Sequence, residues 1–131
     1  EFNSSTSTKL VTWNSSVDCC LWGGVTCHPS NGQIIGLDLS GEGISGPIDG
    51  SNSLFKMQSL QSLNLAYNLY IDGTLPSVIS TLSNLIYLNL SHTGFSGQVP
   101  IGISYLVKLQ ILDISQPFFW PGSFSLCMKS P

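Results

Sequence analysis

The chain has 131 residues, a length that fits one ordinary domain. Hydrophobic residues make up 42% of it and charged residues only 8%, a balance that excludes an intrinsically disordered chain. The net charge of −3, with only four basic residues, provides no cationic surface for phosphates, so we expect no nucleic-acid partner. No apolar run approaches the roughly 20 residues that a membrane span needs, so we also expect no membrane segment in this chain.

The N-terminal part carries indications of an exported protein. The chain opens on Glu1 rather than Met and shows no export signal, so we expect it to be part of a longer chain. Three Asn-x-Ser sequons, at Asn3, Asn14 and Asn89, are glycosylation acceptors if the chain enters the secretory route. Sequons also arise by chance in a chain rich in Asn and Ser, but these gain weight from three cysteines within residues 19–27.

The middle of the chain is an internal repeat. Blocks of the form apolar-x-x-apolar-x-apolar begin at residues 34, 60, 85 and 109, which are 26, 25 and 24 residues apart. The rest of the unit repeats as well, because Gly73-Thr74-Leu75-Pro76 recurs as Gly97-Gln98-Val99-Pro100. An amphipathic helix does not explain these blocks, because their Leu-x-Leu pairs have a period of two. Residues 33–114 are therefore predicted to form about three and a half repeats.

The spacing of the repeat predicts a solenoid. The two leucines of Leu-x-Leu point to one face of a short strand, and one unit cannot bury that face alone. Stacking the units in parallel buries the leucines, each of which contributes about 1.5–3 kcal/mol. The rest of each unit is the crossover between strands, and we expect short helical turns in it at residues 53–57, 78–82 and 102–106.

Two segments resemble a known family. Residues 88–100 closely follow the pattern of the plant-specific class of leucine-rich repeats, with its strand, Ser, Gly and terminal apolar-Pro pair. The block at 13–27, with two Trp, a Cys pair and a third Cys, resembles the cap that precedes such repeats. The resemblance implies an α/β leucine-rich-repeat solenoid, a right-handed superhelix with short parallel strands on the concave side and helical turns on the convex side. Residues 1–32 would be the cap, truncated at its start, and residues 115–131 an irregular tail that lies outside the repeats.

The sequence as a whole is similar to receptor-like proteins of plant immunity, especially the wilt-resistance class. This resemblance implies the extracellular domain of a cell-surface receptor that lacks a kinase domain and functions in defence. It also implies a peptide or protein ligand, a co-receptor kinase acting through the parent protein, and no cofactor. A secreted inhibitor of pectin-degrading enzymes resembles the same cap and repeats and stays open as an alternative. Parallel β-helix enzymes that act on polysaccharides are a second alternative, although they lack this cap and the Leu-x-Leu units.

One position departs from the family pattern. The Asn that closes each strand turn is present as Asn68, whereas its counterparts are Glu42, Thr93 and Pro117. That Asn satisfies backbone groups of neighbouring turns, and buried backbone groups without partners are costly. We expect Thr93 to substitute in part, whereas Glu42 and Pro117 are harder to rationalise at this position.

The four cysteines allow three pairings. The resemblance implies a disulfide between Cys20 and Cys27 and leaves Cys19 without its usual partner. A bond from Cys19 to Cys127 is within reach of the tail, but we favour free thiols at both positions. The spacing Cys-Cys-x6-Cys-His28 lacks the Cys-x2-Cys pair of structural zinc sites, so no metal site is expected.

The residues between the inward leucines are expected to form the binding face. His28 and His92 have no nucleophile or carboxylate placed beside them by a recognisable motif, so we expect neither catalytic residues nor an enzyme. The outward positions on the strands are Gly36, Asp38, Ser62, Asn64, Tyr87, Asn89, Ile111 and Asp113. From this face and the turns just after it, the predicted ligand-binding residues are Asp38, Asn64, Tyr67, Tyr87, His92 and Asp113. A glycan on Asn89 would stand on the same face.

Overall fold

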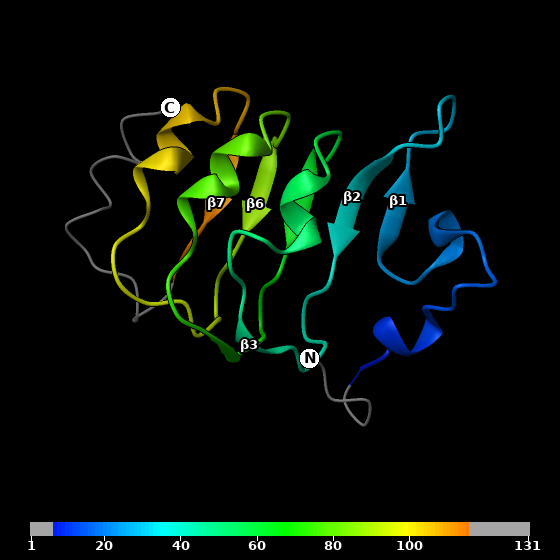
Figure 1. The fold of residues 1–131 in the computed structure, drawn as a ribbon, viewed down its shortest axis with the longest axis horizontal. Coiled ribbons are helices and arrows are strands. Elements are labelled where there is room, and N and C mark those ends of the chain that lie inside the picture. The colour runs from blue at the N-terminus through cyan, green and yellow to red at the C-terminus, as the bar shows by residue number, and fades with distance from the viewer. Residues whose placement is uncertain (1–6, 116–131) are drawn as a thin grey trace.

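The computed structural model describes residues 7–115 and shows a parallel sheet with one antiparallel strand at its N-terminal edge. The sheet has the order β1-β2-β4-β6-β7 (Figure 1). Its strands are β1 (Val25–Cys27), β2 (Ile34–Asp38), β4 (Ser62–Asn64), β6 (Tyr87–Asn89) and β7 (Ile111–Asp113). The parallel strands β2, β4, β6 and β7 are the four predicted Leu-x-Leu units, so the predicted solenoid is confirmed.

The register of the sheet follows the repeat. Leu37, Leu63, Leu88 and Leu112 are aligned across the four parallel strands. Leu63 and Leu88, in the two central strands, are 0% exposed. The side chains on either side of these leucines face the opposite way, as a period of two requires. The predicted inward and outward positions are therefore confirmed.

Short 3-10 helices form the crossovers on the leucine side of the sheet. They are η3 (Ser53–Lys56), η4 (Ser77–Thr81) and η5 (Ile101–Tyr105), each within about one residue of its predicted position. Pro76 and Pro100 occupy the positions before η4 and η5, where an extended backbone leads into the turn. Leu54, Ile79 and Ile103 from these turns join the strand leucines in one hydrophobic core. The turns cover one face of the sheet, and the other face is the predicted binding face, called the concave face below.

A second, smaller sheet was missed by the sequence analysis. It pairs β3 (Ser45–Pro47) with β5 (Tyr70–Asp72) in parallel, and a bridge from Thr74 to Ser96 continues its direction. These residues lie between the strand turn and the 3-10 helix of each repeat. Their pairing depends on contacts between successive repeats, so a strand pattern within one repeat does not reveal it.

The cap is joined to the solenoid by a strand that the sequence analysis also missed. Besides η1 (Leu10–Thr12) and η2 (Cys19–Leu21), the cap contributes β1, which pairs antiparallel with β2. The indole rings of Trp13 and Trp22 stack with centroids 4.9 Å apart. Their Nε1 atoms donate to the carbonyls of Gly23 and Asn14, which fixes the cap loop around the two rings.

Candidate functional site

The concave face carries one row of side chains along each outward position. The first row is Gly36, Ser62, Tyr87 and Ile111, and the second is Asp38, Asn64, Asn89 and Asp113. The first row rises from no side chain at Gly36 to large side chains at Tyr87 and Ile111. Around Gly36 the face is hollowed by a shallow depression of about 210 Å³, which Thr26, Asp38 and Ser62 help to line. The face is thus low beside the cap and higher toward the later repeats.

The residues of the second row stabilise the turns at the strand ends, a role that the sequence analysis did not assign. In each member, Oδ1 accepts a hydrogen bond from the backbone N–H two residues later. The acceptors are Asp38, Asn64, Asn89 and Asp113, and the donors are Ser40, Ala66, Ser91 and Ser115. Such side-chain turns fix the direction in which the chain leaves a strand. The Asp or Asn at the end of each strand is the sequence signal for this role. Because Oδ1 is used in the turn, it is less available to a ligand.

Asp38 is further engaged by the cap. Lys9 Nζ lies 3.1 Å from Asp38 Oδ1, and Ser40 Oγ donates to the same oxygen at 2.7 Å. Partial burial raises the pKa of the Asp38 carboxyl, but the hydrogen bonds from Ser40 and the Lys9 ammonium outweigh it and hold that pKa below its ordinary value. Asp38 is therefore a charged residue whose charge is compensated inside the chain.

Tyr87 is half-buried at the centre of the concave face. Its hydroxyl accepts a hydrogen bond of 3.0 Å from Asn89 Nδ2. The predicted ligand-binding residue of this strand, Tyr87, therefore contacts its predicted glycosylation site directly. The ring offers contact area with few rotatable bonds, and the hydroxyl can still donate one hydrogen bond.

Tyr67 and His92 form an exposed aromatic pair just beyond the strands. Their ring centroids are 4.5 Å apart and their planes differ by 7°. Both backbones lie in the left-handed region, with φ of 59° at Tyr67 and 53° at His92. The sequence placed both residues beside the concave face, but their stacking depends on the exact superposition of two repeats and was not predicted.

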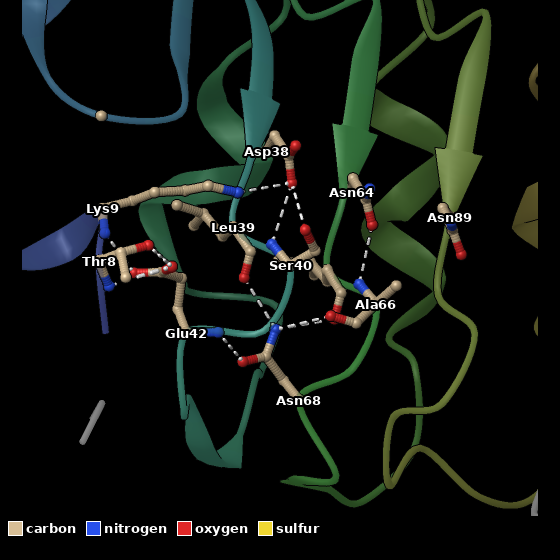
Figure 2. Close-up of polar contacts among 12 residues, drawn as sticks. Thr8, Lys9, Asp38, Leu39, Ser40, Glu42, Asn64, Ala66, Asn68 and Asn89 are labelled. Carbon is tan, nitrogen blue, oxygen red and sulfur yellow. Dashed lines mark hydrogen bonds and ion pairs between the residues drawn. The ribbon is translucent and has the colours of Figure 1, made fainter. Parts of the chain in front are cut away.

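Glu42, which the sequence analysis could not fit to its position, joins the cap to the first repeat (Figure 2). It is 1% exposed, and its carboxylate accepts five hydrogen bonds from residues 7–10 of the cap. Burial raises the pKa of the Glu42 carboxyl, but the hydrogen bonds from Ser7 and the backbone N–H groups outweigh it and lower that pKa to about 2. Glu42, which is hard to rationalise from the sequence, therefore has a defined role at the junction with the cap. Sequence reasoning missed this because the donors lie more than 30 residues upstream.

Asn68 connects the first repeat to the second, as expected. Its Oδ1 accepts from the backbone N–H of Glu42 and its Nδ2 donates to the carbonyl of Leu39 (Figure 2). Its Oδ1 also accepts from Ile44 N–H, and its Nδ2 also donates to the carbonyl of Leu65. One repeat later, the fully buried Thr93 donates from Oγ1 to Leu90, the equivalent of Leu65. Thr93 substitutes in part, as predicted, and Pro117 lies outside the described residues.

The disulfide between Cys20 and Cys27 is confirmed, with Cα atoms 5.6 Å apart. Cys19 has no disulfide partner within residues 7–115, and Cys127 lies outside the described residues. Asp18, Cys19 and Cys20 come within 4.8 Å of one another, but the sulfur of Cys20 is already in the disulfide. Two donors remain there, and four are typical of a structural zinc site.

The polar clusters show no arrangement suited to catalysis within the described residues. His28 Nδ1 accepts from the backbone of Ser30 and lies 2.9 Å from its Oγ, but both bonds belong to one exposed turn. Asp38 and Asp113 end β2 and β7, and two strands separate them. Of the sequons, Asn14 is exposed, Asn89 is half-buried, and Asn3 lies outside the described residues. No helix in the described part is long and apolar enough to cross a membrane.

Comparison with known proteins supports the reading of cap and repeats. The profile of the leucine-rich-repeat N-terminal domain matches residues 1–28, and that of the leucine-rich repeat matches residues 84–106. Receptor-like protein 6 of Arabidopsis thaliana is 40% identical over 119 residues, and receptor-like protein 9DC1 of Solanum pimpinellifolium is 36% identical over 125. These alignments cover 90% and 93% of this chain but only 12% and 14% of those relatives.

Solved structures give the same fold. The leucine-rich-repeat ectodomain of the Arabidopsis receptor kinase HAESA, in complex with an IDA peptide hormone, superposes with a TM-score of 0.74 at 33% identity. The match covers 89% of this chain and 20% of that one. The ectodomain of GASSHO1/SCHENGEN3 from Arabidopsis thaliana, in complex with CASPARIAN STRIP INTEGRITY FACTOR 2, gives a TM-score of 0.74 at 29% identity. That match covers 87% of this chain and 14% of the other.

Proposed function

We propose that this chain, which belongs to the extracellular leucine-rich-repeat proteins of plants, is the N-terminal part of a ligand-binding receptor ectodomain. The proposal is supported by the leucine-rich-repeat N-terminal domain at residues 1–28 and by the similarity to receptor-like proteins. In this proposal the chain is extracellular and functions at the cell surface in defence. It recognises a peptide or protein through its concave face, and the parent protein engages a co-receptor kinase. It catalyses no reaction.

The observation that carries the proposal is the concave face itself. The core leucines of β2, β4 and β6 point away from it, so the side chains of its first row are not needed for the core. The face combines a hollow beside the cap with Tyr87 at the centre and an aromatic pair at the margin. Two similar ectodomains, those of HAESA and GASSHO1, have been solved in complex with a peptide hormone and an integrity factor, which supports a binding role.

The geometry ranks the six proposed ligand-binding residues. Asp38, Asn64 and Asp113 each hold a turn with Oδ1, so we assign them a secondary part in binding. Tyr67, Tyr87 and His92 are not needed to cap a strand and offer aromatic surface at low entropic cost, so we assign them the main part. This ranking follows from which atoms remain available to a partner.

Glycan masking tests the proposal. Ser62→Asn with Asn64→Thr creates a sequon at the centre of the concave face, and Lys56→Asn with Gln58→Thr creates one at the end of η3 on the opposite side. The proteins are secreted from plant cells and tested against displayed linear peptides that were selected on the unmodified chain. We expect the concave glycan to abolish binding and the glycan at η3 to leave it unchanged.

A matched control separates the glycan from the substitutions. Ser62→Gln with Asn64→Thr keeps the second substitution without creating a sequon, and because Asn64 has only a secondary part in binding, it should weaken binding only modestly. Binding that survives the concave glycan, or that is lost equally with the glycan at η3, would reject the concave face as the recognition surface.

A further inference from the structure

Three residues occupy the same position in successive repeats. They are Gly41, Tyr67 and His92, with φ of 64°, 59° and 53°. The backbone N–H of Gly41 donates to Ala66 at 2.9 Å, and that of Tyr67 donates to Ser91 at 3.1 Å, so the three turns lie side by side. A left-handed backbone is natural for Gly and disfavoured for residues with a Cβ atom. The fold therefore accepts glycine at this position, as in the first repeat, yet carries strained aromatic residues in the next two.

The aromatic row has an open end. His92 covers one face of Tyr67 at 4.5 Å, and Tyr67 is nevertheless 63% exposed, so its other face meets solvent. That face looks toward the first repeat, where Gly41 has no side chain. Among residues 7–115, a Cβ atom built on Gly41 meets no heavy atom within 4 Å. The row of stacked rings thus ends in a slot above Gly41, at the place where a third ring would stand.

We propose that this slot is a subsite for one aromatic side chain of the ligand, which stacks on the open face of Tyr67 and completes a row of three rings with His92. The inference rests on the proposed function, because it assumes a peptide or protein ligand, and adds the chemistry that one position of that ligand must have. Strained residues that the fold does not require are typical of functional sites. Parallel-offset stacking at this ring spacing is a favourable arrangement for aromatic pairs.

The charges around the slot favour a neutral ring over a guanidinium group. The two carboxylates of the same turn, Asp38 and Glu42, are both compensated within the chain. Lys9 and Ser40 bind Asp38, and residues 7–10 bind Glu42. A guanidinium above Gly41 would therefore meet no free anion, so that stacking on the Tyr67 ring would be its only favourable contact there. A Phe, Tyr or Trp side chain requires no such partner.

The probe for the slot is N-acetyl-L-tryptophanamide, followed by NMR through the Tyr67 ring protons of the isotopically labelled chain. We expect an upfield, saturable shift of the Tyr67 signals, because a stacked indole shields them. N-acetyl-L-leucinamide should give no such shift. Tyr67→Phe should retain affinity, whereas Gly41→Tyr, which fills the slot from the chain itself, should weaken it at least fivefold. Tyr105→Ser removes a similarly exposed tyrosine on η5 and should change nothing.

Two further variants guard against a folding artefact. Tyr67→Asn removes the ring but keeps a residue that tolerates a left-handed backbone, so it should fold and lose the probe. His92→Asn should also fold, and because it removes only the far ring of the row, its loss of probe affinity should be smaller than that of Tyr67→Asn. An absent shift, an equal shift with the leucine derivative, or full affinity in Gly41→Tyr would overturn the subsite.

The peptide experiment separates this inference from the proposed function. Peptides selected on the chain should share one aromatic residue, and replacing that residue with Ala should weaken binding to the parent but not to Gly41→Tyr. Peptides that lose binding to the variant with the concave glycan, but that need no aromatic residue, would overturn the subsite and leave the proposed function intact. If the probe shifts the NMR signals of Tyr67 but no peptide loses binding to the variant with the concave glycan, the ring-binding slot would stand and the proposed function would be rejected.

Discussion

Glu42 and Asn68 are equivalent residues of successive repeats, and each holds the unit that precedes it. Asn68 Oδ1 accepts from two backbone N–H groups of the first repeat, and Glu42 Oε1 accepts from Lys9 and Leu10 of the cap at 2.8 and 3.0 Å. The cap presents only donors to this position, whereas the first repeat also presents the carbonyl of Leu39 to the Asn68 amide. A carboxylate therefore suits the junction with the cap, and an amide suits the junction between repeats.

The charge of Glu42 predicts a pH-dependent stability. Its pKa in the folded chain is lowered from 4.5 to about 2, so the folded state favours the ionised form. The resulting stabilisation is fully present above the unfolded pKa and is lost as pH falls from about 4.5 toward about 2. We expect up to about 3 kcal/mol of the free energy of unfolding to be lost over this window, measured by urea unfolding at several pH values.

Glu42→Gln isolates that contribution from those of the other carboxyl groups, of which Asp38 and Asp49 also have lowered pKa values. The variant places an amide N–H₂ among donors, so it should lose about 1–3 kcal/mol at neutral pH. Its stability should then fall less steeply with acid than that of the parent. Parallel curves for the two proteins would show that Glu42 does not stabilise the cap through its charge.

Leu88 tests the register of the solenoid. It is 0% exposed between Leu63 and Leu112 on neighbouring strands, so Leu88→Ala leaves a cavity that the flanking strands cannot easily close. We expect a loss of about 2–5 kcal/mol in the free energy of unfolding. Val107→Ala, which removes methyl groups from a side chain that is 86% exposed, should cost less than about 0.5 kcal/mol. Similar midpoints for both variants would contradict the assigned core.

The parts of the fold that the sequence predicts are those encoded within one repeat. Leu-x-Leu determines which residues face inward, and the repeat length aligns Leu63 with Leu88, so strands, turns and outward positions follow. The missed features depend on contacts between units: β1 on β2, β3 on β5, and the cap on Glu42. Their partners are separated by about ten to thirty-five residues and carry no motif. The stacking of Tyr67 on His92 belongs to the same class.

Gly94 tests the close contact between successive repeats. A Cβ atom at this position would lie far inside van der Waals contact with the carbonyl oxygen of Ile71, and 2.6 Å from that of Leu69. Both obstacles are backbone atoms and cannot move without disturbing β5. Gly94→Ala should therefore lower the free energy of unfolding by about 2 kcal/mol or more. Gly50→Ala, where the nearest atom is a methyl carbon of Val78 at 3.3 Å, should cost clearly less, and equal losses would contradict the tight contact.

Glycan occupancy should differ between the two sequons in the described part of the chain. Asn14 is exposed, whereas Asn89 is half-buried, donates from Nδ2 to the Tyr87 hydroxyl, and is followed by Ser91, which is 3% exposed. The sugar attaches through Nδ2 and the transferase must reach the Ser as well, so Asn89 can be modified only before β6 is in place. We expect near-complete occupancy at Asn14 and low occupancy at Asn89, measured by peptide mass spectrometry of protein secreted from plant cells.

A folding defect should change that ratio in a defined direction. Leu88→Ala leaves both sequons intact but delays or weakens the packing of β6, so occupancy at Asn89 should rise while that at Asn14 stays constant. Unchanged occupancy at Asn89 in this variant would show that folding does not protect the site. Full occupancy at Asn89 in the parent would place a glycan beside Tyr87, and ligand contacts would then have to lie nearer the cap, at Gly36 and Gly41, or along later repeats of the parent protein.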